Sequence, residues 1–396
     1  MALFDHSTIN FDVLRQSAFN FRWAEVPEGV IPLTAADSDF PMAPELVEGL
    51  TAAIQKGYMP YTPKLGFPEV CESIAKQLNT RKNEHVDPRF VLPIDSAARG
   101  MYIIARVILR PGDEALIFDP VDYLFARSTE AAGAKPVYFP CRVTADNRID
   151  LSALESYITP RTRMIGLCNP HNPLGTVYSR EDLQLILDLA EKYDLYIMND
   201  EIWSDIVYAP AEFVSILSLH PDNNHRILSV YGFSKSFSIA GLRAGCIYVA
   251  DQDMFSRVVE VSEVETTAGG ICSLSQLAAK ICMDQCYYWN EAFVRKMKEN
   301  RDYAVHRMRR MVGIKPNVPD ALFMLFPDIT QTGMDSQSFA DYLASEYKLA
   351  VVPGTAKFFG PGAEGHIRVC LATSHEILEE AMNRLETALA NLAGRY

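Results

Sequence analysis

The stretch that decides the fold reads Ser234-Lys-Ser-Phe-Ser-Ile-Ala-Gly-Leu-Arg-Ala-Gly245. It directly follows Ile227–Val230, an apolar run that predicts a buried β-strand. Lys235 would then lie at the carboxyl end of a strand, where ligands bind in an open α/β sheet. Small and apolar neighbours help Lys235 to lose its proton, as a Schiff-base amine must. Eight residues later, Arg243 offers a guanidinium fork that suits a phosphate.

Apolar strand-like runs alternate with amphipathic helical stretches on both sides of this segment. A helix over Arg180–Lys192, with Ser179 as its N-cap, is one of these stretches. The alternation predicts an α/β fold, a three-layer sandwich around a mostly parallel sheet. Besides Ile227–Val230, the predicted strands are Ala115–Phe118, Pro136–Phe139, Met164–Cys168, Leu195–Met198 and Cys246–Val249.

The pattern changes after about residue 274, where a long helical stretch over 273–311, with a break near 287–290, leads into short strands. The last helix is predicted from a capping box of Thr373 and Glu376 and an apolar stripe that begins at Leu378. We therefore predict a large domain over 45–285 and a smaller α+β domain from 286–396 and the loop-like segment 1–44. The predicted short strands are Ala321–Phe326, Leu349–Val352 and Ile367–Leu371.

The composition excludes several classes of protein. The 396 residues carry a net charge of −13, which disfavours nucleic acid as a partner. No apolar run is long enough to span a membrane, and the first residues lack the basic and apolar regions of an export signal. We therefore expect a cytoplasmic location. The eight cysteines are scattered singly, so we expect reduced packing thiols and no metal site.

Further polar residues follow the predicted strands. Asp200 ends one of these strands. A carboxylate at this position either pairs with a pyridinium nitrogen or is simply a solvated acid at a strand end. Asn172 lies in the turn-rich loop Asn169-Pro-His-Asn-Pro-Leu-Gly175. The small residues after Asp95 predict the start of a helix whose backbone N–H groups could bind a phosphate. The alternative is an ordinary helix start, capped by Asp95 or Ser96, with no ligand. Arg368, on a late strand, suits a carboxylate.

Taken in order along the chain, these segments resemble the fold-type I pyridoxal 5′-phosphate (PLP) enzymes, specifically the class I/II aminotransferase superfamily. The resemblance runs from about Pro32 to the C-terminal helix. It implies that Lys235 forms the Schiff base and shuttles the Cα proton, and that Asp200 pairs with the pyridine nitrogen. It also implies that Asn172 contacts the phenolic oxygen. The implied phosphate ligands are Ser96, Ala97, Ala98, Ser234 and Arg243.

The resemblance also implies parts of the site outside the strand ends. Tyr61 matches a tyrosine that reaches the phosphate of the partner subunit, which implies a homodimer with shared active sites. Arg368 matches the arginine that binds the substrate α-carboxylate. The stretch Thr34-Ala-Ala-Asp-Ser-Asp-Phe-Pro41, which includes Ala36, resembles the loop that closes over the substrate.

Three positions depart from the family pattern. Trp203 stands where a tyrosine usually donates to the phenolic oxygen, and an indole cannot reproduce that hydroxyl contact. Gly232 replaces a frequent phosphate-binding serine. The ring-stacking aromatic residue is expected at Asp122, so its neighbour Tyr123 is the predicted stacking residue.

Transamination between an L-amino acid and a 2-oxo acid is the leading prediction. The stretches Asn169–Gly175, Asp200–Ile206 and Ala36–Pro41 also look like the MalY/PatB cystathionine β-lyase branch, so carbon–sulfur β-elimination is the alternative. A third alternative is a PLP-binding regulator, which the acidic charge opposes. In the dicarboxylate-specific members of the family that the chain resembles, an arginine of the partner subunit, in the loop before the long helix, binds the distal carboxylate. The matching segment 262–270 contains acids and no arginine, so the resemblance implies that aspartate or glutamate is not the expected donor, and Glu263 or Glu265 would instead suit a basic side chain.

Overall fold

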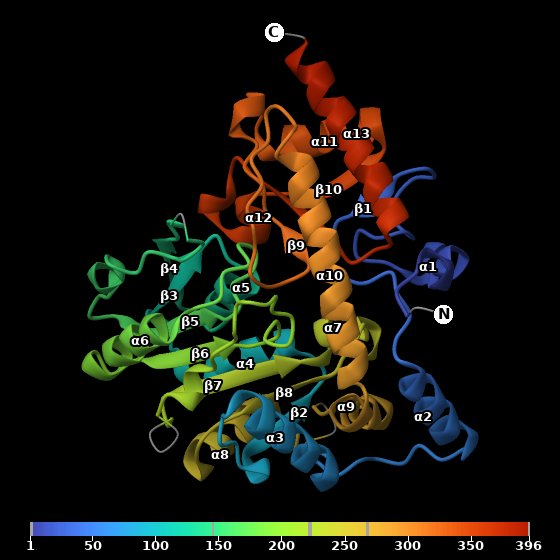
Figure 1. Ribbon diagram of the computed structural model, residues 1–396. Helices are drawn as coiled ribbons and strands as arrows, with labels where there is room; N and C mark the ends of the chain where they lie inside the picture. Colours follow the sequence, from blue (N-terminus) through green and yellow to red (C-terminus); the bar gives the residue numbers. More distant parts are fainter. Residues whose placement is uncertain (1–2, 145, 221–223, 267–268, 395–396) are drawn as a thin grey trace.

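The computed structural model describes residues 3–144, 146–220, 224–266 and 269–394. A large sheet and a small sheet lie in different parts of the molecule, and the long helix α10 (Tyr287–Met308) extends from one toward the other (Figure 1). The seven strands of the large sheet are, in spatial order, β2 (Val91–Ile94), β8 (Gly245–Tyr248), β7 (Ile227–Gly232), β6 (Tyr196–Asp200), β5 (Thr162–Cys168), β3 (Glu114–Asp119) and β4 (Lys135–Pro140).

The large sheet is mostly parallel, as predicted. Strands β7, β6, β5, β3 and β4 run parallel to one another, whereas β8 is antiparallel to both β7 and β2. The six strands predicted for this sheet are all present. Strand β2 was not predicted, because Val91–Ile94 is a short apolar run with an internal proline.

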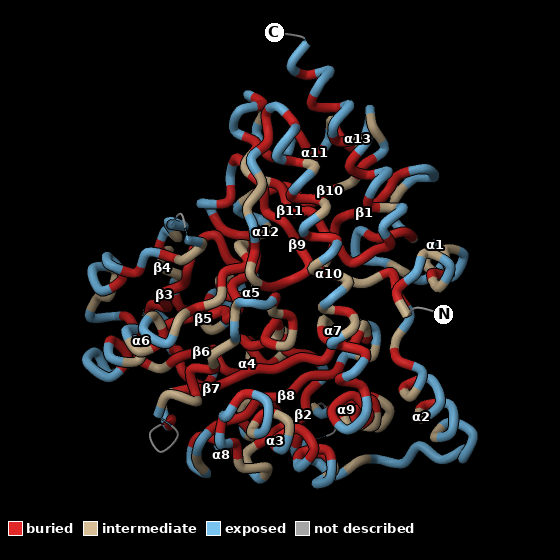
Figure 2. Tube along the Cα trace, viewed as in Figure 1, coloured by how far each residue is buried: buried red, intermediate tan, exposed pale blue. Residues whose placement is uncertain are grey.

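Helices cover both faces of the large sheet. Alternate residues of β3 point to opposite faces, so Leu116 packs in one apolar core and Ile117 in another. The buried sheet between exposed helices is visible in Figure 2. The three-layer sandwich is therefore confirmed. The covering helices are α3 (Pro68–Lys82), α6 (Arg180–Lys192) and α9 (Ser273–Gln285) on one face, and α4 (Ala97–Ile108), α5 (Leu124–Ala131) and α8 (Gln252–Ser262) on the other.

The small sheet has the order β1-β10-β11-β9. Its first strand comes from the N-terminal segment and pairs in parallel with β10, and the other pairs are antiparallel. The apolar stripe of the last helix is buried against this sheet, as predicted. The elements are β1 (Ile31–Leu33), β9 (Met324–Leu325), β10 (Leu349–Pro353), β11 (Ile367–Cys370), α11 (Ser336–Tyr347) and α13 (His375–Ala393).

Two details of the prediction were wrong, and a third was confirmed. The N-terminal segment is not simply loop, because it forms α1 (Phe11–Ser17) and β1. The helical stretch after residue 273 is broken at Cys286, directly beside the predicted position, into two helices. The N-cap of α13 is Ser374, whose hydroxyl accepts a hydrogen bond from the N–H of Ile377 at 3.3 Å. Thr373 cannot cap because Asn300 holds its carbonyl at 2.8 Å inside the core.

The remaining helices are short, apart from α2, which packs beside α9. Two of them, α7 and α12, carry pocket residues and are described below. The bounds are α2 (Pro44–Gln55), α7 (Phe233–Ser236), α12 (Ala356–Phe359), and the 3-10 turns η1 (His6–Thr8), η2 (Pro88–Phe90), η3 (Leu154–Tyr157), η4 (Ile216–Ser218), η5 (Ala240–Leu242), η6 (Thr330–Thr332) and η7 (Pro361–Ala363).

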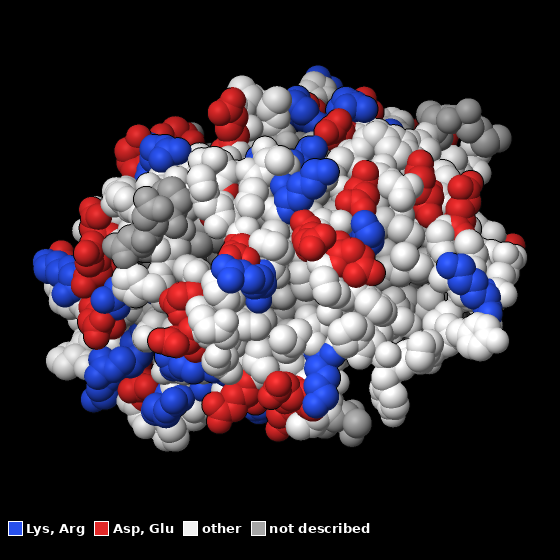
Figure 3. All heavy atoms as spheres, turned by 90° about the horizontal axis from the view of Figure 1, so that it is seen from below, with Lys and Arg blue, Asp and Glu red and all other residues white. Residues whose placement is uncertain are grey.

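The surface mixes charges of both signs. On the face seen from below, acidic and basic side chains are interspersed around a broad uncharged area (Figure 3). No helix in the described part of the chain is long and apolar enough to cross a membrane. All eight cysteines are free thiols, and six of them are buried.

Candidate active site

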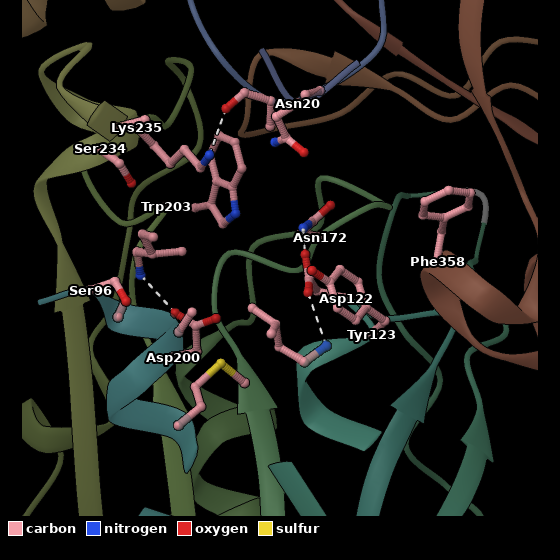
Figure 4. Close-up of a pocket in the computed structure, with 18 of the residues that line it drawn as sticks. Asn20, Ser96, Asp122, Tyr123, Asn172, Asp200, Trp203, Ser234, Lys235 and Phe358 are labelled. Atoms are coloured by element: carbon pink, nitrogen blue, oxygen red, sulfur yellow. Dashed lines mark hydrogen bonds between the residues drawn. The ribbon is translucent and has the colours of Figure 1, made fainter. Parts of the chain in front are cut away.

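A pocket of about 440 Å³ lies at the carboxyl ends of β5, β6 and β7, between the two sheets (Figure 4). Its walls come from segments far apart in the sequence, including the N-terminal segment, α4, α7 and β11. Among the residues predicted for the site, Tyr61, Glu263 and Glu265 do not line this pocket, and all the others do. The predicted residues that line it are Ala36, Ser96, Ala97, Ala98, Tyr123, Asn172, Asp200, Trp203, Ser234, Lys235, Arg243 and Arg368.

Lys235 lies on α7, the single helical turn that follows β7. Its Nζ donates a hydrogen bond to the carbonyl oxygen of Ala36 at 2.6 Å (Figure 4). Burial lowers the pKa of Lys235; the nearby Asp37 carboxylate opposes this shift, and the Arg368 guanidinium adds to it. A lysine in these surroundings is more readily available as a neutral amine, the form that bonds to a carbonyl carbon.

Asp200 is the last residue of β6, and its side chain faces the pocket (Figure 4). Its Oδ1 accepts a hydrogen bond from the N–H of Ile202 at 3.0 Å. Burial raises the pKa of Asp200 to about 7, although the Ile202 hydrogen bond works against the rise. No cation of the described residues forms an ion pair with it. A buried, unpaired carboxylate of this kind suits a cationic ring nitrogen.

The start of α4 forms a cradle for an anion. Ser96 is the N-cap, and its Oγ accepts a hydrogen bond from the N–H of Arg99 at 3.2 Å. Neighbouring glycines keep this helix end open and close to the sheet, since a Cβ at Gly245 would lie 2.6 Å from the nitrogen of Ala97. A Cβ at Gly232 would lie 2.9 Å from the end of the Ile202 side chain, so a serine there would require that side chain to shift.

Arg243 completes this side of the pocket. It has a left-handed backbone (φ 51°) at the end of η5, and it directly precedes the tight contact of β8 with α4. Its guanidinium is exposed and forms no ion pair within the described residues. A helix start and a free guanidinium facing one pocket together suit a phosphate group.

Asn172 follows β5 and is almost fully buried. Its Nδ2 donates to Oδ2 of Asp122 at 3.1 Å, and its Oδ1 is buried without a hydrogen-bond partner in the described structure. The amide donor that we expected to serve the cofactor is therefore shared with Asp122. Asp122 was not predicted as a site residue, because an acid at the position expected for the stacking aromatic residue carries no recognisable signal.

Arg368, on β11, lies 5.0 Å from the ring centroid of Phe359 and is 9% exposed. Its Nε has no hydrogen-bond partner among the described residues. Burial lowers the pKa of Arg368, and the carboxylate of Asp122 opposes this shift. A buried guanidinium with an unused donor suits the carboxylate of a small molecule.

Two aromatic residues face the cavity from different sides. The indole of Trp203 lies beside the Lys235 amine, 5.8 Å from the Nζ, and is held by an edge contact with Phe323 (Figure 4). Tyr123 lies across the cavity and is 43% exposed. Its backbone N–H donates to the carbonyl of Phe358 at 3.1 Å, so the two walls are linked.

The family model "Aminotransferase class I and II" matches residues 28–385. The chain belongs to this family. The aspartate aminotransferase of Pyrococcus horikoshii is 32% identical to this aminotransferase over 371 residues, 93% of each chain. The crystal structure of an aromatic aminotransferase from the same organism has a TM-score of 0.85 at 31% identity, covering 92% of this chain and 97% of that one. Cystalysin from Treponema denticola shares the fold, with a TM-score of 0.90 at 23% identity over 98% of this chain and 99% of that one.

The aminotransferase is thus a PLP-dependent transferase, and its pocket fits the cofactor. The unpaired carboxylate of Asp200 suits the ring nitrogen, and the α4 cradle with Arg243 suits the phosphate. The Lys235 amine lies in the same pocket as both.

The N-terminal strap, residues 18–41, was only partly predicted. The segment from Thr34 to Pro41 was expected to close the site, and Ala36 does contact Lys235. Asn20 and Phe21 also line the pocket, both with positive φ, and the hydroxyl of Thr34 donates to the Phe21 carbonyl. Asn20 lies at the upper side of the cavity in Figure 4. Exposed residues in an irregular loop give no periodic signal, so the sequence did not reveal them.

Tyr61 lies outside the pocket of its own chain and is 95% exposed. It belongs to an apolar segment between α2 and α3 that also exposes Tyr58, Met59 and Leu65. A run of exposed large apolar side chains is typical of an interaction surface. Glu263 and Glu265 also do not line the described pocket.

Proposed function

We propose that the transamination catalysed by this aminotransferase is carried out by Lys235, Asp200, Arg243 and Arg368. The observation that supports these roles is their convergence on one pocket from four separate segments of the chain. When bound, PLP supplies a carbonyl carbon for the amino group and a ring that withdraws electrons from Cα.

Lys235 is the residue proposed to move the proton. Its lowered pKa favours the neutral amine, whose Nζ can take the proton from the substrate Cα and hold it for return. With this proton moved, the amino group can stay with the cofactor while water supplies the carbonyl oxygen of the released 2-oxo acid. The Ala36 carbonyl, 2.6 Å from Nζ, limits the directions in which the amine can point.

Asp200 and Arg243 hold the cofactor in this proposal. Asp200 keeps the ring nitrogen protonated, because an ion pair in a buried site favours both charged partners. Arg243 and the N–H groups at the start of α4 bind the phosphate. Tyr123 and Trp203 confine the ring from the sides, and Ser234 and Asn172 offer polar contacts.

Arg368 orients the substrate. A bidentate pair between Arg368 and the α-carboxylate fixes the position of the carboxylate and restricts how the rest of the amino acid can turn. The Cα proton can then be directed toward Lys235, which lines the same pocket. The N-terminal strap, which covers the site through Ala36 and Phe21, helps to exclude water from the charges inside.

We further propose a cytoplasmic homodimer, with 45–285 as the large domain and 1–44 with 286–396 as the small domain. The exposed segment around Tyr61 supports the dimer, because this tyrosine has no neighbours that would bury it in its own chain. In the dimer, Tyr61 would reach the phosphate in the pocket of the partner.

The test is an absorbance scan of purified protein mixed with single amino acids and with cystathionine, without any 2-oxo acid. Transamination predicts a change to the spectrum of the aminated cofactor, with one equivalent of 2-oxo acid formed. The β-lyase alternative predicts continuous release of pyruvate and ammonia with the original spectrum restored. If every active substrate gave this continuous release of pyruvate and ammonia, the proposed transamination would be wrong.

A further inference from the structure

The charged side chains that line the pocket do not balance. Two are acids and five are bases, although the whole chain is acidic, with a net charge of −13. They are Asp122, Arg127, Asp200, Lys235, Arg243, Lys357 and Arg368.

The proposed function gives a partner to most of these charges. Asp200 pairs with the ring nitrogen, Lys235 bonds to the cofactor, Arg243 binds the phosphate and Arg368 binds the α-carboxylate. Asp122 is already held within the protein by Asn172 and by the N–H of Leu124 at 3.1 Å. The proposed function assigns no binding partner to the two remaining bases, Arg127 and Lys357.

Arg127 and Lys357, here called the rim pair, come from the two sides of the pocket. Arg127 lies on α5, one turn after Tyr123, and Lys357 lies on α12 beside Phe358. Both side chains are exposed, and neither forms an ion pair with any described carboxylate. The Lys357 Nζ lies 5.2 Å from the ring centroid of Phe358, a cation–π contact that does not neutralise its charge.

The pocket does not end at the rim pair. A second hollow of about 280 Å³ shares Arg127, Lys357 and Tyr123 with the main pocket. Glu130 also lines this second hollow but forms no ion pair with Arg127 in the described structure. A substrate held by Arg368 therefore has room to extend past Tyr123, toward two positive charges.

We propose that the rim pair binds the terminal carboxylate of a dicarboxylic amino acid and of the corresponding 2-oxo acid. This inference rests on the proposed function, because it places the α-carboxylate on Arg368. Unpaired cations at the end of a site favour a negatively charged side chain and repel a basic one. The rim pair would thus replace an arginine from the partner subunit, which the segment 262–270 lacks.

The first test is binding, without turnover. Glutarate has two carboxylates and no amino group. Pentanoate has the same number of carbon atoms but only one carboxylate. We would titrate both into the PLP-loaded enzyme and follow the absorbance of the lysine-bound cofactor. The variants are Arg127→Gln, Lys357→Gln and the double variant. The control is Arg310→Gln, at an exposed arginine that lines neither hollow.

We expect glutarate to bind about threefold to tenfold more weakly in each single variant, because each removes one solvent-screened charge. The double variant should lose more affinity for glutarate than either single variant. Added salt should weaken the binding of glutarate to the wild type. The affinity for pentanoate should be the same in all the variants. Equal losses for glutarate and pentanoate, or no loss in the double variant, would overturn the inference.

The second test is turnover with glutamate and with glutamine, which differ only in the terminal charge. The ratio of their kcat/KM values should fall toward 1 in the double variant and stay unchanged in Arg310→Gln. If no amino acid is transaminated while the glutarate pattern holds, the proposed function fails and the anion site stands. If transamination proceeds with an unchanged ratio, the anion site fails and the function stands.

Discussion

The two sides of the pocket are built differently. On the large-sheet side, polar groups stand at the ends of β5, β6 and β7 or at the start of α4, where regular hydrogen-bonded elements hold them in place. On the other side, the N-terminal strap contributes irregular backbone, including Asn20 and Phe21 with positive φ, and α12 is a single helical turn. The groups proposed for chemistry thus stand at the ends of regular elements, whereas the strap proposed to cover the site is a loop.

This difference also appears in how the two sides are joined. The Ala36 carbonyl accepts from Lys235, and the Phe359 carbonyl accepts from the N–H of Val121 at 2.8 Å. Asp119, at the end of β3, accepts from the N–H of Gly362 at 2.8 Å. Backbone groups provide most of these links, so they hold the walls together without depending on a particular loop side chain.

The largest effect is expected on the rigid side, from Lys235→Ala. This variant should bind PLP loosely, lose the absorbance of the lysine-bound cofactor and lose at least about 10³-fold in activity, because it has neither the bonding amine nor the proton carrier. The measurement is 2-oxo acid formation together with an absorbance scan. Lys135→Ala, at an exposed position on β4, is the control. Full activity in Lys235→Ala would refute the central role of this residue.

Arg368→Lys should have the next largest effect. Lysine keeps the charge but loses the planar fork, so kcat/KM for every amino acid should fall about 100-fold. The loss should appear with alanine as much as with longer substrates, since all share the α-carboxylate. Kinetics with a series of amino acids check this. A loss confined to one side-chain class would show that Arg368 reads the side chain instead.

On the loop side, Asp39→Asn should loosen the strap. Asp39 accepts hydrogen bonds from Arg22 and from the indole N–H of Trp23, the latter at 2.7 Å, and is buried with both. Asparagine keeps an acceptor but leaves the Arg22 charge unpaired, so the free energy of unfolding should fall by about 2 kcal/mol. Urea unfolding measures this loss. We expect KM to rise more than kcat falls; a collapse of kcat alone would mean that the strap takes part in the chemistry.

The smallest effect concerns the link at Asp119. Burial raises the pKa of Asp119 to about 6, although the hydrogen bond from Gly362 opposes the rise. The folded protein therefore binds a proton that the unfolded chain releases near pH 4, and stability should fall as the pH rises from about 4 to about 6. Over this pH range, the fall in the free energy of unfolding should be smaller by roughly 1 kcal/mol in Asp119→Asn than in the wild type. The figure is this small because solvent partly screens the site.

Unfolding curves of both proteins at pH 4.5 to 8 would show the contribution of Asp119 as a difference. The difference matters because Asp200, whose pKa is raised to about 7 in the cofactor-free protein, adds a slope of the same sign to both proteins when they are unfolded without cofactor. Identical slopes in the two proteins would show that Asp119 ionises normally.

Much of the fold and of the pocket lining was predictable because strands buried on both faces read as continuous apolar runs, and the residues that follow them must meet at one sheet edge. This places Lys235, Asp200 and Asn172 together without any structure. The short strand β2 and the strand β1 escaped prediction, since a three- or four-residue run is held by its partners rather than by its own pattern.

The sequence by itself determined the α/β architecture, the family and the residues at the strand ends, because hydrophobic periodicity and local turn chemistry are written into neighbouring positions. Only the tertiary structure decided which residues outside the strand ends complete the pocket. Arg127 and Lys357 are separated by more than half the chain, and only the packing of α12 against the loop before α5 brings them to one rim. The same holds for the strap, because a contact such as Lys235 with Ala36 depends on long-range packing that no local pattern encodes.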